Sequence, residues 1–102
     1  MMATAPRIDD LSGIRLFVHE VLCQFNQLEA GIFQMTEKVL TRSGIPCGMF
    51  FCLHGPRSIK LTAVWETDGN TVLFYGSTGE RQHKAQLELG GSKLLDTMAA
   101  IA

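Results

Sequence analysis

Apolar residues recur at three- and four-residue intervals along the first part of the chain, which is the spacing of one face of an α-helix. The recurring positions are Leu11, Ile14, Val18, Val21, Phe25 and Leu28. Asp9 or Asp10 comes just before them, and an aspartate there can accept hydrogen bonds from free backbone N–H groups of the first turn. The pattern predicts an amphipathic helix that begins after these aspartates and follows a loose lead over residues 1–8.

The end of this helix has two interpretations. The helical spacing continues through Met35 and Val39, so one helix could run from about residue 10 to 43. Alternatively, the helix ends near residues 30–31 and a strand follows, in which Glu37 is the exception to an alternating pattern. The longer helix would run about 50 Å and overhang a sheet whose strands span about 23 Å. Average helices are also much shorter, and we therefore favour a helix followed by a strand.

The middle of the chain predicts antiparallel strands joined by short turns. The segment "MFFCLH", residues 49–54, is apolar on both parities, which is typical of a strand that is covered on both faces. The segment "IKLTAVWE" alternates, and "TVLFYG" follows the hairpin signal "TDGN". The face that we expect to pack against the helix carries Ile59, Leu61, Ala63 and Trp65.

The last part of the chain is less regular. Residues 81–89 alternate well enough to predict a fifth strand at an edge of the sheet, and two glycines end it. Ser92 can cap a short C-terminal helix, whose apolar residues are Leu94, Leu95, Met98 and Ile101. The sequence thus predicts an α+β fold: an N-terminal helix packed on a four- or five-stranded antiparallel meander, with a short C-terminal helix.

The length and composition of the chain indicate its number of domains and its expected compartment. A chain of 102 residues fits a single domain over residues 1–102, with residues 99–102 expected to be loose. Hydrophobic residues make up 46% and charged residues 19%, which is typical of a folded domain. The sequence shows no signal-peptide pattern and no apolar run of membrane-spanning length. Its three cysteines are therefore expected to be reduced thiols in a cytoplasm.

One stretch carries a resemblance. The segment "PCGMFFCLHGPRSIKLTAVWETDGNTVLFYGSTGER", residues 46–81, resembles a segment of small uncharacterised planctomycete-type bacterial proteins. It covers roughly a third of the chain. The resemblance implies a bacterial, cytoplasmic origin, and it implies no activity, cofactor or functional residue.

Two cysteines and a histidine invite a thiol or metal interpretation. Zinc takes thiolate and imidazole ligands, usually four, and Cys47, Cys52 and His54 would need a fourth from Cys23 or His83. The spacing C-x4-C-x-H is not a zinc signature. As a nucleophile–base pair, Cys52 and His54 would have Cβ atoms about 6–7 Å apart on one strand face, which is too far for ready contact. We therefore expect no metal, no cofactor and no catalytic residue, with Cys52 as a small buried hydrophobe.

A nucleic-acid site is the second candidate. A basic patch could form from Arg57, Lys60, Arg81, His83 and Lys84, with Trp65 and Tyr75 as stacking surfaces. The net charge of −1, with Glu66, Asp68 and Glu80 close by in the sequence, weakens this interpretation. A helix followed by about five strands is also the element order of Sm-like RNA-binding barrels, although their paired motifs are absent. That similarity is an analogy of fold only.

The function that the sequence favours is a non-enzymatic interaction or regulatory module that associates with itself. A strand that is apolar on both parities needs cover on two faces. The N-terminal helix covers one face, and the other needs either the C-terminal helix, which is short and follows two glycines, or a second subunit. A symmetric homodimer is the commonest solution, and we expect it to bury at least about 1,200 Å². A nucleic-acid-binding module is the alternative, and a thiol or metal site at Cys47, Cys52 and His54 is the third hypothesis. No membrane partner is expected.

Overall fold

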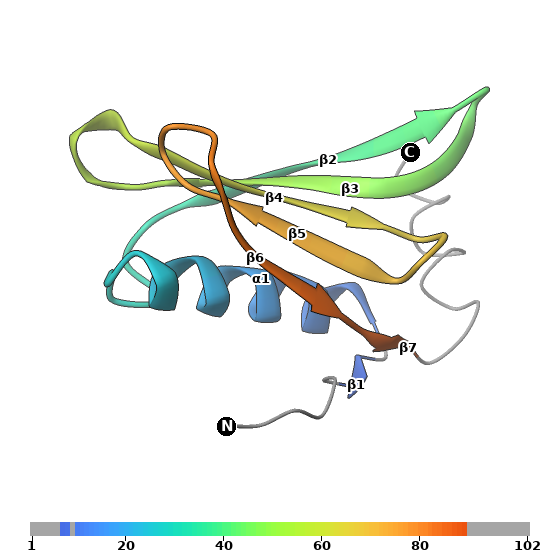
Figure 1. The fold of residues 1–102 in the computed structure, drawn as a ribbon, viewed down its shortest axis with the longest axis horizontal. Helices are drawn as coiled ribbons and strands as arrows, with labels where there is room; N and C mark the ends of the chain where they lie inside the picture. The colour runs from blue at the N-terminus through green and yellow to red at the C-terminus, as the bar shows by residue number, and fades with distance from the viewer. Residues whose placement is uncertain (1–6, 9, 90–102) are drawn as a thin grey trace.

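The computed structural model describes residues 7–8 and 10–89, in which one helix packs on one face of a five-stranded antiparallel sheet (Figure 1). The sheet strands are adjacent in chain order, so the sheet is a simple meander. The elements are α1 (Leu11–Phe25), β2 (Met35–Arg42), β3 (Ile45–His54), β4 (Lys60–Glu66), β5 (Thr71–Tyr75) and β6 (Arg81–Gln86). The predicted α+β meander is confirmed, and it has five strands.

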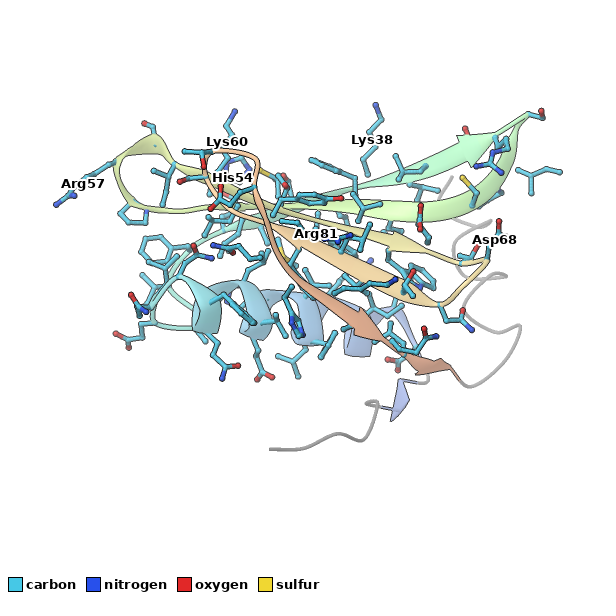
Figure 2. The ribbon with its side chains drawn as sticks, viewed as in Figure 1. Lys38, His54, Arg57, Lys60, Asp68 and Arg81 are labelled. Atoms are coloured by element: carbon cyan, nitrogen blue, oxygen red, sulfur yellow. The ribbon has the colours of Figure 1, made fainter. Side chains whose placement is uncertain are left out.

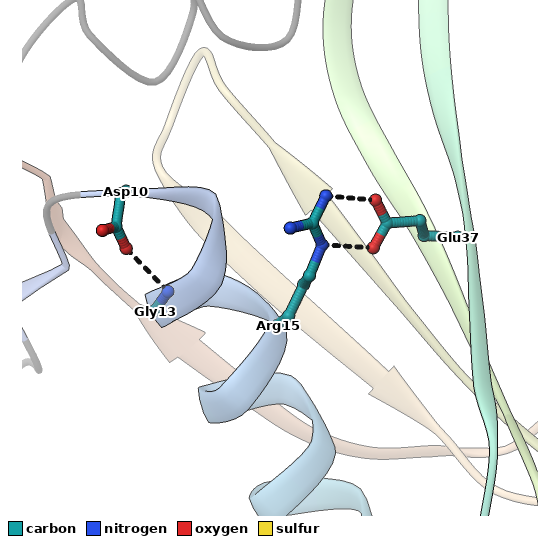
Figure 3. A network of polar contacts seen from close by, with 4 residues as sticks. All are labelled: Asp10, Gly13, Arg15 and Glu37. Carbon is teal, nitrogen blue, oxygen red and sulfur yellow. Dashed lines mark hydrogen bonds and ion pairs between the residues drawn. The ribbon is translucent and has the colours of Figure 1, made fainter. Parts of the chain in front are cut away.

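Helix α1 begins where the sequence predicts and ends earlier. The carboxylate of Asp10 accepts a hydrogen bond from the Gly13 N–H at 2.8 Å, so Asp10 rather than Asp9 is the cap (Figure 3). The expected end near residues 30–31 is wrong, because the helix ends at Phe25. Asn26 stops it: its Nδ2 donates to the Leu22 carbonyl at 2.8 Å, and the next residue has a positive φ of 55°. A left-handed residue cannot continue an α-helix.

The buried face of α1 differs in part from the predicted stripe. Leu11, Ile14 and Val18 are buried as expected, and Leu22 and Cys23 join them. Phe25 was expected on the same stripe but remains 42% exposed. Phe25 is the last residue of the helix, and its ring stacks on His83 of β6 instead of entering the core.

The choice of a strand after the helix is confirmed by β2. It forms a hairpin with β3 through Ser43 and Gly44, whose φ angles are 53° and 79°. Two positive φ angles in a two-residue turn match the twist of the flanking strands. The hairpin pairs Arg42 with Ile45, so β3 starts at Ile45 rather than at residue 49 as expected.

The core lies between α1 and the sheet. Leu61, Ala63 and Trp65 face the helix and are fully buried, which confirms the predicted inward face of β4. Trp65 is the largest of the buried side chains. The neighbouring strands add Met49, Phe51, Leu53, Val72 and Phe74, each with no exposed surface.

A second, smaller sheet was not predicted. β1 (Arg7–Ile8) pairs in parallel with β7 (Glu88–Leu89), which brings the two ends of the described chain together. The expectation of a loose lead over residues 1–8 therefore does not hold for Arg7 and Ile8. The expected helix after Ser92 and the expected loose end over residues 99–102 lie outside the described residues.

The five-stranded sheet is open. Its order is β2-β3-β4-β5-β6, with β2 and β6 as the two edges. A barrel would require these two edge strands to pair with each other. The analogy with Sm-like barrels therefore does not extend to the sheet closure in the part of the chain that the structure describes.

Candidate functional site

The face of the five-stranded sheet opposite α1, called the open face below, is formed by every second residue of each strand. The strand register aligns these residues in three rows that cross the whole sheet, with His54 and Lys60 as neighbours beyond them. The first row is Thr36, Cys52, Thr62, Tyr75 and Arg81. The second row is Lys38, Phe50, Val64, Leu73 and Lys84. The third row is Leu40, Gly48, Glu66, Thr71 and Gln86.

Positive charge gathers on the open face. Lys38, Lys60, Arg81 and Lys84 are all exposed there, the exposed Arg42 continues the same parity of β2, and Glu66 is the single carboxylate among the described strand residues of this face. Figure 2 shows the side chains of Lys38 and Lys60 extending away from the helix side of the sheet. The whole chain has a net charge of −1, so the basic side chains are segregated onto this face rather than present in excess.

This segregation was missed by counting charges along the sequence. Asp68 and Glu80 appear to dilute the basic residues in a linear count, but they lie in the β4–β5 and β5–β6 turns rather than on the open face. Lys38 lies far from the others in sequence and joins them through the β2–β3 pairing. Assigning each charge to a face and a register position would have found the pattern.

The centre of the open face is apolar and only partly covered. Phe50, Val64, Leu73 and Tyr75 are half-buried, and Cys52 is 8% exposed. "MFFCLH" is therefore covered by α1 on one face, whereas its other face belongs to this partly exposed surface. The open face thus combines an apolar centre with a basic margin.

The structure brings together most of the basic residues named from the sequence. Lys60, Arg81 and Lys84 are on the open face, and Arg57 extends from the loop that links β3 to β4 (Figure 2). His83 lies on the other side of the sheet. Its ring stacks on Phe25 of α1, with centroids 4.9 Å apart and planes at 27°. His83 is therefore a packing residue between the helix and β6, separate from the basic face.

The two proposed stacking residues are also separated. Trp65 is fully buried on the helix side, so its ring is not accessible to a ligand. Tyr75 lies on the open face and is half-buried. Phe50, which the sequence pattern places only within a covered strand, is the second aromatic residue of this face.

The proposed thiol or metal residues do not converge on a closed site. Cys52 and His54 share the open face, and the His54 Nε2 lies 3.0 Å from the Thr36 hydroxyl oxygen. Cys47 lies where the β2–β3 register shifts, and all three cysteines are free. Residues 7–8 and 10–89 contain no group of three or more His, Cys, Asp or Glu side chains arranged to hold a metal ion.

The remaining cysteine belongs to the helix–loop junction. Burial raises the pKa of the Cys23 thiol, which keeps it protonated. Its Sγ lies 3.8 Å from the Nε2 of His19, and that nitrogen accepts a hydrogen bond from the Gly31 N–H at 2.9 Å. His19 therefore ties the loop after α1 back to the helix, which is a structural role.

No family model, no curated protein and no solved structure matches the chain. Among the described helical residues, no helix is long and apolar enough to cross a membrane.

Proposed function

We propose that the protein is a non-enzymatic binding module whose interaction surface is the open face and whose partner is an anionic polymer. The observation that carries the proposal is the charge of this face: among the described residues, five exposed Lys and Arg side chains stand against one carboxylate, in a chain of net charge −1. Such a local field attracts a polyanion even when the whole protein is slightly acidic. The open sheet face also gives an extended partner room to lie across the strands.

Binding to a polyanion can be tested with heparin at several salt concentrations. Affinity should fall as salt rises, because contacts with Lys and Arg release the counterions of the polymer. Replacing both Lys38 and Lys84 by Gln should weaken binding strongly, since these residues lie at the two ends of one row. Heparin affinity that is absent at low salt would contradict the proposal.

Two carboxylates give a matched control for the location of the site. Glu66 lies on the open face and Glu20 is exposed on α1, on the other side of the molecule. Changing either to Gln alters the net charge by the same amount. Glu66→Gln should strengthen heparin binding more than Glu20→Gln, because charges farther than about 8 Å are largely screened at physiological salt. Equal effects of the two substitutions on heparin binding would show that heparin contacts a surface other than the open face.

Self-association, the function favoured by the sequence, is a second candidate on the same surface. It is supported by the partly exposed apolar centre, formed by Phe50, Val64 and Leu73. A symmetric dimer through two open faces would cover this centre and would also bring two sets of basic side chains together. Because like charges that meet across an interface are unfavourable, an anionic partner fits the margin of this face better than a second copy does.

A further inference from the structure

We infer that the anionic polymer is a single-stranded nucleic acid, whose bases stack on Phe50 and Tyr75 while its phosphates meet the basic residues beside them. The inference rests on the proposed function and adds the class of ligand. It follows from the way in which the aromatic and basic residues are paired across the strands of the open face.

Each aromatic residue of the open face has a basic residue directly opposite it on a neighbouring strand. Phe50 of β3 pairs with Lys38 of β2, and Tyr75 of β5 pairs with Arg81 of β6. In a regular antiparallel pair such as Phe50 and Lys38 the Cβ atoms lie about 4.5–5.5 Å apart, and the pair of Tyr75 with Arg81 follows a register shift between Phe74 and Tyr75. A ring and a cation are thus held side by side at two places, which is the combination that a base and its phosphate require.

The two aromatic residues are also well separated for this purpose. They lie two strands apart and one same-face step along the strands, with Thr62 and Val64 of β4 between them. Strand spacing and residue rise place their Cα atoms about 12 Å apart. Sheets that bind single strands carry two or three stacked bases on their aromatic residues. The open face therefore offers one ring for each of two bases.

The surroundings favour an unpaired strand over other anionic polymers. In a duplex the base faces are already stacked inside, so Phe50 and Tyr75 would find no base face to contact. Heparin offers negative charge but no aromatic face. Thr62 lies on β4 between the strands of the two rings, and Thr36 lies at the β2 end of the same row; their hydroxyl groups can hydrogen-bond to base edges or sugars. Only a single strand uses the rings, the hydroxyls and the cations together.

The inference predicts how the full chain discriminates between polymers. At equal salt, labelled oligothymidine or oligouridine should bind more tightly than the corresponding duplex and more tightly than heparin fragments of similar charge. A log–log salt slope no steeper than about −3.5 is expected for the single strand, given five basic side chains on the open face. Comparison of oligothymidine with oligouridine shows whether DNA or RNA is preferred.

Variants separate stacking from charge. Phe50→Leu and Tyr75→Leu keep an apolar side chain at each position, and each should weaken single-strand binding by about tenfold or more. Both variants should leave heparin binding unchanged. Phe25→Leu is the matched control, because Phe25 is an exposed aromatic residue on the helix side, and it should leave single-strand binding unchanged.

A spectroscopic measurement on the unmodified chain covers the case in which a variant does not fold. Addition of oligothymidine should shift the ring proton resonances of Phe50 and Tyr75 and leave the indole resonance of the buried Trp65 in place. Equal affinity for single strand, duplex and heparin, or unshifted ring resonances on binding, would overturn the stacking inference while leaving the polyanion function intact. Binding of none of the three polymers would remove the proposed function itself.

Discussion

Arg15 of α1 and Glu37 of β2 form an ion pair with two parallel hydrogen bonds, from Nε to Oε1 and from Nη2 to Oε2, each 2.7 Å long (Figure 3). The pair connects the helix to the edge strand of the sheet. Its hydrogen bonds to the carboxylate raise the pKa of Arg15, so the guanidinium stays charged. The side chains are 42% and 27% exposed, so solvent screens the interaction.

We expect the coupling between Arg15 and Glu37 to be small but measurable. A double-mutant cycle with Arg15→Gln and Glu37→Gln, followed by urea unfolding, should give a coupling free energy of about 0.5–1 kcal/mol. It should decrease when salt is added. A coupling that is zero at low salt would show that the two side chains do not hold β2 against the helix.

The same pair shows what alternation along a strand can predict. Glu37 is the exception to the alternating pattern of β2, because it occupies a position that faces the helix, where the pattern predicts an apolar residue. Glu37 lies on an edge strand of the sheet, where its inward carboxylate meets Arg15 instead of the core. The strand and its inward parity were predictable, whereas the partner was not, because it depends on how the helix lies across the sheet.

The open face shows a similar limit. The alternation of β4 and the hairpin before β5 were visible in the sequence, and both are confirmed. The pairs of Phe50 with Lys38 and of Tyr75 with Arg81 depend on strand register, which the alternation along each strand does not assign. The parallel pairing of β1 with β7 joins residues at opposite ends of the chain, and no local pattern marks it.

Trp65 provides a test of the core. Trp65→Ala should lower the free energy of unfolding by about 3–5 kcal/mol, because a fully buried ring leaves a large cavity. That loss is a large part of the stability of a small domain. Trp65→Phe should cost clearly less, since the Trp65 Nε1 is buried without a hydrogen-bond partner among the described residues, and its removal leaves no donor unsatisfied. Thermal unfolding that gives equal melting temperatures for both variants would contradict this assignment.

Gly48 is expected to be essential for the β3–β4 contact. A Cβ atom at this position would overlap the backbone carbonyl oxygen of Trp65, which cannot move aside as a side chain can. Gly48→Ala should therefore destabilise the protein by about 1–3 kcal/mol. Gly69→Ala is the control, because a Cβ atom there would lie 3.7 Å from the nearest atom, the Thr71 hydroxyl oxygen. Denaturant unfolding should show little change for the control.

Cys23 should make the protein less stable at alkaline pH. Burial raises the pKa of this thiol in the folded chain above its ordinary value of 9.0. Below that value both states are protonated and stability is unaffected; above it the unfolded chain loses the proton first, so the free energy of unfolding falls as pH rises. Cys23→Ala should remove this part of the decline. Superimposable pH–stability curves for the two proteins would contradict the prediction.

Self-association and nucleic-acid binding should respond to salt in opposite directions. A dimer through two open faces brings the basic margins of both copies together, so added salt should screen their repulsion and strengthen the dimer. Polyanion binding should weaken under the same change. Sedimentation equilibrium should therefore show a mass nearest 11.2 kDa at low salt and a growing dimer fraction at high salt.

The variant Glu66→Gln provides a second, independent test of whether the open face binds a nucleic acid or a second copy of the chain. It removes the single carboxylate of the open face, so each copy becomes more basic there. The variant should therefore dimerise less readily than the unmodified chain and bind oligothymidine more tightly, with Glu20→Gln as the control of equal charge. A mass of 11.2 kDa at every salt concentration would exclude self-association. A dimer that weakens with salt would show that the copies meet through a surface other than the open face.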